Sequence, residues 1–82
     1  MKAVGTSFDP ATVTVSSGGT INFQNTSGFA HTFTIDGQNI DSTVNGGAST
    51  TIDINLKPGT YDFYCRFHGS PGSGMHGTLK VT

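Results

Sequence analysis

One segment decides the fold: residues 58–69, which read PGTYDFYCRFHG. After the turn signal of the Pro-Gly pair, side chains alternate along 60–65, which predicts a half-buried strand. One face of that strand holds Tyr61, Phe63 and Cys65, and the other holds Asp62 and Tyr64. Because the charge of Asp62 marks its own face as solvent-facing, we expect Cys65 to point into the core at the end of the strand.

The rest of the chain contains further short alternating runs. They are 12–16, 20–25, 31–35, 49–56 and, at the C-terminus, about 77–81. The first two runs flank Ser17-Gly18-Gly19 and are predicted to pair as a hairpin. Residues 37–48 are polar and glycine-bearing, so we expect them to be irregular. Six or seven short strands predict an all-β fold, a Greek-key β-sandwich or small barrel.

Composition supports this fold class and excludes several functions. A chain of 82 residues is long enough for one domain, which we expect to span 1–82. Of these residues, 33 are Gly, Thr or Ser, which disfavours helices. Only 11% of residues are charged and the net charge is −1, so nucleic acid is not an expected partner. No apolar run is long enough for a membrane-spanning helix, and no signal peptide is recognised after Met1. A bound metal would help to stabilise so small a core.

The residues able to bind a soft metal are few and grouped. Cys65 is the single cysteine, which excludes an internal disulfide, a four-cysteine zinc site and an iron–sulfur cluster. His68 follows it by three positions, Met75 lies in the next glycine-rich stretch, and His31 opens a distant strand. Thiolate and thioether suit Cu(I), while imidazole suits both oxidation states of copper. Two imidazoles, a thiolate and a weak thioether form the ligand set of blue-copper electron-transfer sites.

Motifs along nearly the whole chain resemble the cupredoxin family, close to its plastocyanin-like branch. The matching motifs are Phe8-Asp9-Pro10, Val13-x-Val15, Gly19-Thr20, Phe23-x-Asn25, His31-Thr32, Pro58-Gly59-Thr60-Tyr61, Tyr64-Cys65-Arg66-Phe67-His68-Gly69 and Gly74-Met75-His76-Gly77. The resemblance implies one copper ion per chain, with His31, Cys65 and His68 as equatorial ligands and Met75 as the axial ligand. The chain departs from the family pattern in the large number of residues between His68 and Met75. We expect the intervening loop 69–74 to arch outward so that Met75 can still reach the metal.

Two alternatives remain open for the fourth ligand. Met75 could instead be a core methionine that fills a gap, and His76 could compete for its position. Because His76 is adjacent to Met75, it is expected to face the solvent.

The resemblance also implies roles for neighbouring residues. The backbone N–H groups of Thr32 and Phe67 are expected to donate to the Cys65 sulfur. Asn25 either holds the loop before His31 by side-chain hydrogen bonds or is an ordinary turn residue. Tyr61 resembles the tyrosine corner of Greek-key sandwiches.

The predicted function is single-electron transfer between redox partner proteins through the exposed edge of His68. An uncharged rim is expected around it, formed by Phe29, Ala30, Pro71 and Gly72, and such a surface suits weak, transient contacts made by a monomer. Arg66 either orients an acidic partner or is a solvated strand-end residue. The family resemblance implies a periplasmic or extracellular location.

Other functions are less consistent with the residues. Copper storage or delivery could use the same ligands, and ready transfer of copper to a chelator rather than rapid electron self-exchange would indicate it. An enzyme is not expected, because an inward Cys65 cannot attack a substrate and the paired H-x-H motifs of multicopper oxidases are missing. A metal-free adhesive sandwich would leave the Cys, His and Met residues unexplained.

Overall fold

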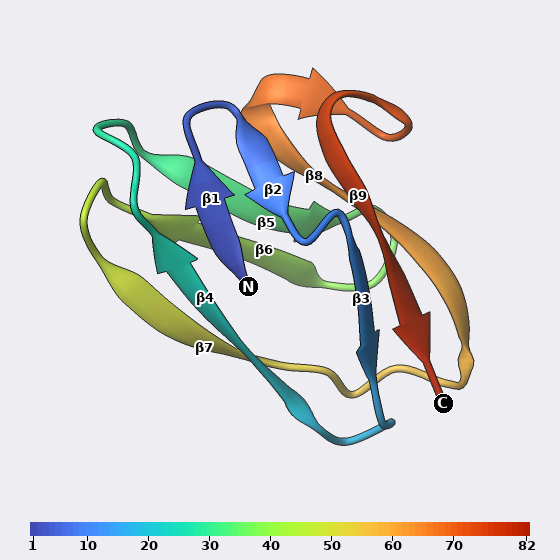
Figure 1. The fold of residues 1–82 in the computed structure, drawn as a ribbon. Coiled ribbons are helices and arrows are strands. Elements are labelled where there is room, and N and C mark those ends of the chain that lie inside the picture. The colour runs from blue at the N-terminus through green and yellow to red at the C-terminus, as the bar shows by residue number, and fades with distance from the viewer.

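The computed structural model describes residues 1–82 as nine strands without a helix (Figure 1). The strands are β1 (Lys2–Val4), β2 (Ser7–Asp9), β3 (Thr12–Val15), β4 (Thr20–Asn25), β5 (His31–Ile35), β6 (Ile40–Val44), β7 (Ser49–Asp53), β8 (Gly59–Ser70) and β9 (Ser73–Val81). The predicted all-β class is therefore confirmed. No helix of the length and apolarity needed to cross a bilayer is found.

The strands form two sheets that face each other as a sandwich (Figure 1). One sheet has the order β2-β1-β4-β7 and the other the order β3-β9-β8-β5-β6. Pairing is parallel between β1 and β4 and between β3 and β9, and antiparallel elsewhere. The second sheet places β8 between β9 and β5, so the segment that contains Cys65 lies in the interior of the sheet.

The core between the sheets is rich in phenylalanine and extends to Cys65. The Phe63 ring stacks on Phe33 at a centroid distance of 4.6 Å and meets the edge of Phe8 at 4.9 Å. Cys65 and Met75 belong to the same buried cluster. The predicted alternation is confirmed, because Phe63 and Cys65 are fully buried while Asp62 is exposed. The cysteine therefore lies at one end of a continuous apolar core.

The predicted hairpin between 12–16 and 20–25 is wrong. β3 and β4 belong to different sheets: β3 runs parallel to β9 and β4 pairs with β7. Between them, Ser17 N–H donates to Thr82 C=O and Gly18 N–H donates to Ile54 C=O, so the turn contacts the ends of both sheets. Alternation identifies which side chains are buried, but it does not identify the partner strand.

The expectation of an irregular segment at 37–48 is also wrong. It contains β6, which pairs with β5 across a turn in which Gly37 and Asn39 have φ values of 73° and 59°. Only Ile40 and Val44 are apolar in this strand, and they are too few to produce a clear periodic pattern. The short strands β1 and β2 extend the count beyond the expected seven.

Gly77 gives the core a testable packing constraint. A Cβ at this position would collide with the Phe63 ring and lie 2.6 Å from the Ala11 carbonyl oxygen. We predict that Gly77→Ala lowers the free energy of unfolding by about 1–3 kcal/mol through overpacking. The matched control is Gly28→Ala, where a Cβ would meet nothing within 4 Å. Urea unfolding measures both, and equal stability of the two variants would contradict this packing.

Candidate metal centre

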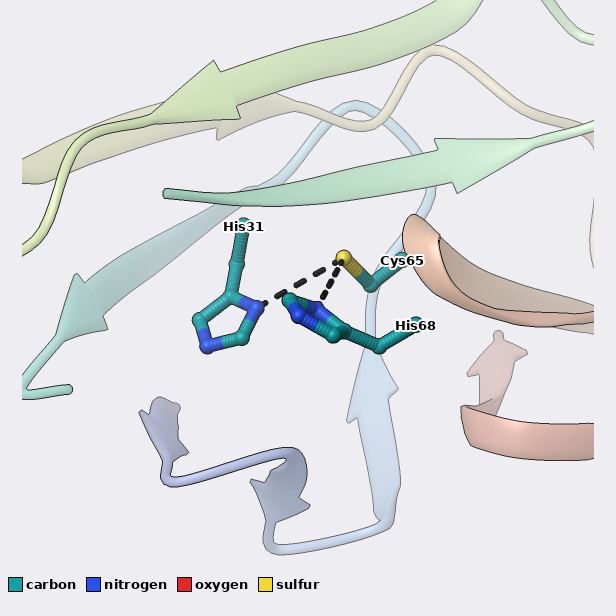
Figure 2. A group of neighbouring side chains, drawn as sticks. All are labelled: His31, Cys65 and His68. Carbon is teal, nitrogen blue, oxygen red and sulfur yellow. Dashed lines mark hydrogen bonds between the residues drawn. The ribbon is translucent and has the colours of Figure 1, made fainter. Parts of the chain in front are cut away.

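Three side chains from two strands converge at one end of the sandwich (Figure 2). His31 is the first residue of β5, and Cys65 and His68 lie in β8. Sγ of Cys65 is 3.6 Å from Nδ1 of His31 and 3.6 Å from Nδ1 of His68. The three potential ligand atoms lie within 4.8 Å of one another. The structure thus brings together three of the four residues that the sequence nominated as ligands.

The local backbone explains why Cys65 and His68 converge. Regular pairing of β8 with β9 is interrupted between Tyr64 and Gly69 and resumes at Gly69↔Gly74 and Ser70↔Ser73. A bulge of this kind bends a strand and redirects its side chains. Both residues lie within this irregular stretch, and the thiol and the imidazole are directed to the same point (Figure 2).

The hairpin beyond the bulge differs from the loop expected from the sequence. Residues 69–74 form paired strand ends around a turn at Pro71 and Gly72, and not an arching loop. Gly69 permits this close pairing, because a Cβ there would lie 2.5 Å from Met75 N and 2.8 Å from Ser73 O. The glycines that suggested flexibility instead allow two backbones to approach closely.

The spacing of the ligand atoms fits one metal ion. Imidazole nitrogen and thiolate sulfur bind a metal such as zinc at about 2.0 and 2.3 Å. Two such ligands on one ion, at angles near 110–120°, are about 3.5–3.7 Å apart. The observed 3.6 Å separations match this value. A thiolate with two imidazoles is also the donor set of blue-copper sites, so the residues present fit copper.

A backbone carbonyl fixes which nitrogen of the His31 ring is free to bind a metal. Nε2 lies 2.7 Å from Gly5 C=O, so this nitrogen bears the proton and donates, which leaves the Nδ1 lone pair directed at Cys65. Desolvation by burial lowers the pKa of His31 below its usual value, and His68 lowers it further, against the opposing effect of Gly5. The neutral, ligating form of the ring is therefore favoured. Sequence reasoning missed Gly5, because a backbone carbonyl has no sequence signal.

The Cys65 sulfur is buried and receives one backbone hydrogen bond. Cys65 is fully buried, and Thr32 N–H donates to Sγ at 3.4 Å, which confirms the donor expected from the sequence. Phe67 makes no such bond in the structure, so the expectation of a second donor is wrong. A donor to the sulfur favours the thiolate.

Asn25 holds the loop that precedes His31. Its Nδ2 donates to Phe29 C=O at 2.7 Å and to Val44 C=O at 2.9 Å, and its Oδ1 accepts from Ser27 N–H at 3.0 Å. The structuring role of Asn25 is confirmed over that of an ordinary turn residue. The tyrosine corner is confirmed as well, since Tyr61 O–H donates to Lys57 C=O at 2.7 Å.

Met75 lies on β9 opposite the irregular stretch of β8. It stands between Gly74, which pairs with Gly69, and His76, which pairs with Tyr64, and its exposed fraction is 1%. Its neighbour His76 is exposed, as expected. These positions favour Met75 over His76 as a fourth ligand, which stays a prediction.

The exposed side of the site is aromatic and electrically neutral. His68 is exposed, and its ring centroid lies 6.2 Å from Phe29 and 6.5 Å from Phe67. The two phenylalanines are 58% and 53% exposed. Phe29 was expected in this rim, whereas Phe67 was not, because nothing in the sequence distinguishes an exposed phenylalanine from a core one. Arg66 is a solvent-exposed residue, and it pairs with Asp41 at 2.9 Å, so its charge is balanced within the chain.

Comparisons with known proteins agree with this geometry. A family model described as a cupredoxin-like domain matches residues 1–81. Plastocyanin A/B of Petroselinum crispum is 35% identical over 88 residues, covering 94% of this chain and 89% of the relative. The chloroplastic plastocyanin of Oryza sativa subsp. indica is 36% identical over 85 residues; the match covers 90% of this chain and 54% of the relative, about half its length.

Solved structures share the fold. A reduced mutant of amicyanin superposes with a TM-score of 0.79 at 18% identity, over 99% of this chain and 78% of the other. A copper-containing nitrite reductase of Thermus scotoductus SA-01 gives a TM-score of 0.76 at 26% identity, over 99% of this chain and 21% of the enzyme.

Asn25 provides a test of how the site is held. Truncation in Asn25→Ala removes the side-chain donor to the carbonyls of Val44 and Phe29, and only Phe29 keeps a second side-chain donor, the Ser27 hydroxyl at 3.1 Å, so we predict a loss of about 2–3 kcal/mol in the free energy of unfolding. The control is Asn45→Ala, at an exposed position in the adjoining loop. Chemical denaturation of the metal-free protein measures both variants. If Asn25→Ala were as mild as Asn45→Ala, the loop would not depend on this side chain.

Proposed function

The chain belongs to the family of cupredoxin-like domains, and from this premise we propose that it is a mononuclear type 1 copper protein that carries single electrons. The observation that supports this most is the convergence of Cys65 Sγ with two imidazole nitrogens, each 3.6 Å away, inside the copper-protein fold. The chain's relatives include plastocyanins, and the amicyanin fold is shared. Residues 1–82 form one copper-binding domain in this proposal.

We propose that His31, Cys65 and His68 hold the metal and that Met75 supplies a weak fourth contact. Copper, when bound, supplies a reversible one-electron change between Cu(I) and Cu(II). The protein keeps the ligand atoms of His31 and Cys65 buried, which excludes water from that side of the site. The bonds from His31 to Gly5 and from Thr32 to Cys65 hold both ligands in position without the metal. A site fixed in this way needs little rearrangement when its charge changes.

Electrons pass through the exposed edge of His68. The surrounding rim contains Phe29 and Phe67, and the charge of Arg66 is balanced by Asp41. A small, apolar and neutral surface favours short-lived contacts with redox partner proteins and gives little electrostatic steering. We propose that the chain acts as a monomer and works in a periplasmic or extracellular compartment.

We propose no enzymatic activity for this chain. The nitrite reductase that shares the fold matches over 21% of its own length only. The buried Cys65 has no access to a substrate, and its sulfur is surrounded by the two imidazoles and the Thr32 amide. These features support a carrier of electrons.

Copper titration tests the proposal. Adding Cu(II) to the metal-free protein is predicted to produce an intense blue charge-transfer band that saturates at one copper per chain, because a buried thiolate would bind the ion. Visible absorption measures the band and circular dichroism checks the fold. Cys65→Ser is predicted to lose the band while keeping the fold. A folded, colourless wild-type protein in excess copper would contradict the proposal.

The role of Met75 requires a separate variant. Met75→Leu conserves volume in the buried cluster, so we predict that the fold and the blue band persist with a shifted reduction potential. Cyclic voltammetry measures the potential, and His76→Ala at the exposed neighbour is the control. An unshifted potential in Met75→Leu, or a shift in His76→Ala instead, would show that Met75 is not the axial ligand.

A further inference from the structure

A closed ring of hydrogen bonds lies beside the site and joins three strands. The Arg66 backbone N–H on β8 donates to Thr32 Oγ1 on β5 at 2.8 Å, and Thr32 Oγ1 lies 3.0 Å from Thr34 Oγ1. Thr34 O–H donates to Asp41 Oδ1 on β6 at 2.9 Å. Arg66 Nε–H closes the ring by donating to the same oxygen at 2.9 Å.

The charge of Asp41 determines which groups in the ring donate hydrogen bonds and which accept them. Hydrogen bonds from Arg66 and from Thr34 hold the pKa of Asp41 below its ordinary value, so the carboxylate is ionised and can only accept. Thr34 therefore uses its proton toward Asp41, and its oxygen accepts the proton of Thr32. The Thr32 oxygen keeps its lone pairs for the Arg66 N–H. Each bond in such a chain polarises the next one and strengthens it.

Two residues of the ring, Arg66 and Thr32, connect it to Cys65. The Arg66 amide belongs to the peptide bond that follows Cys65, and the Thr32 backbone N–H donates to the Cys65 sulfur. Thr32 therefore contacts the backbone after Cys65 with its hydroxyl and the side chain of Cys65 with its amide. Thr32 is fully buried and Thr34 is 5% exposed, so the hydrogen bond between their hydroxyl groups lies in the interior.

The ring combines an exposed ion pair with buried hydroxyl groups. The Arg66 and Asp41 side chains are 41% and 51% exposed, and an ion pair at such a surface contributes little. The buried hydroxyls of Thr32 and Thr34, in contrast, connect the carboxylate to the peptide of Cys65.

We propose that Thr34 and Asp41 are positioning residues for the Cys65 thiolate: through Thr32, they fix the peptide and the N–H donor that set the position of the sulfur. This inference rests on the proposed copper function for its consequence, because the position of the sulfur then sets the copper–thiolate bond. The ring itself is a property of the metal-free protein.

The first test uses the protein without metal. In Thr34→Val the hydroxyl is lost at nearly constant shape, and we expect hydrogen exchange of the Arg66 and Thr32 amides to become at least about fivefold faster, the factor of a single hydrogen bond. Thr34→Ser, which keeps the hydroxyl, should restore slow exchange. Thr43→Val, at the exposed residue paired with Thr32 on β6, should change neither amide. Unchanged exchange in Thr34→Val would overturn the proposal.

The second test uses the copper-loaded protein and changes Asp41, an exposed member of the ring. Asp41→Ala is expected to shift the wavelength of the copper–thiolate band and the reduction potential, whereas Asp62→Ala, which removes the same charge from an exposed site on β8, is expected to shift neither. Equal shifts in both variants would indicate a simple charge effect and would contradict positioning. A wild-type protein without the band would refute the proposed function, while the exchange measurement would still decide on the ring.

Discussion

The structure depends on one contact, the approach of the Cys65 sulfur to the Nδ1 atoms of His31 and His68 at 3.6 Å each. A sulfur atom and two imidazole nitrogens at this spacing direct lone pairs at one another, which is unfavourable unless a proton or a cation lies between them. The surrounding protein must therefore hold the three side chains in place. β8 supplies the rigid base, because it lies between β9 and β5 and its Phe63 is packed in the aromatic core. The bulge between Tyr64 and Gly69 then turns His68 toward Cys65.

Each remaining element near the site restrains one of these three side chains. The turn between β1 and β2 supplies the Gly5 carbonyl that orients His31. Asn25 holds the loop that leads into β5. Thr32 donates to the sulfur and accepts from the peptide after Cys65. Gly69 and Gly74 allow the two backbones of the closing hairpin to approach closely, because a Cβ at Gly69 would collide with the Met75 backbone and one at Gly74 with the His68 carbonyl. The small sandwich therefore uses much of its polar interior to fix a metal site.

Sequence reasoning found the parts of this arrangement that are encoded by side-chain pattern. Alternation along 60–65 identified the buried face of Cys65, and the Cys65-x-x-His68 spacing placed two candidate ligands close together. Pairing partners could not be predicted, because β3 and β4 alternate in the same way whether they pair with each other or with β9 and β7. β6 was missed since it has only two apolar residues. The Gly5 carbonyl and the exposed Phe67 gave no signal, because their roles arise from tertiary position.

We propose that the geometry of the candidate ligands exists before a metal binds. Crystal structures of the metal-free and copper-loaded protein test this preorganisation. Both Sγ–Nδ1 distances are predicted to stay near 3.6 Å in the metal-free crystal, with the hydrogen bonds of Gly5 and Thr32 kept. Rotation of either imidazole away from Cys65 in the metal-free crystal, with the three side chains converging only after copper is added, would contradict a preformed site.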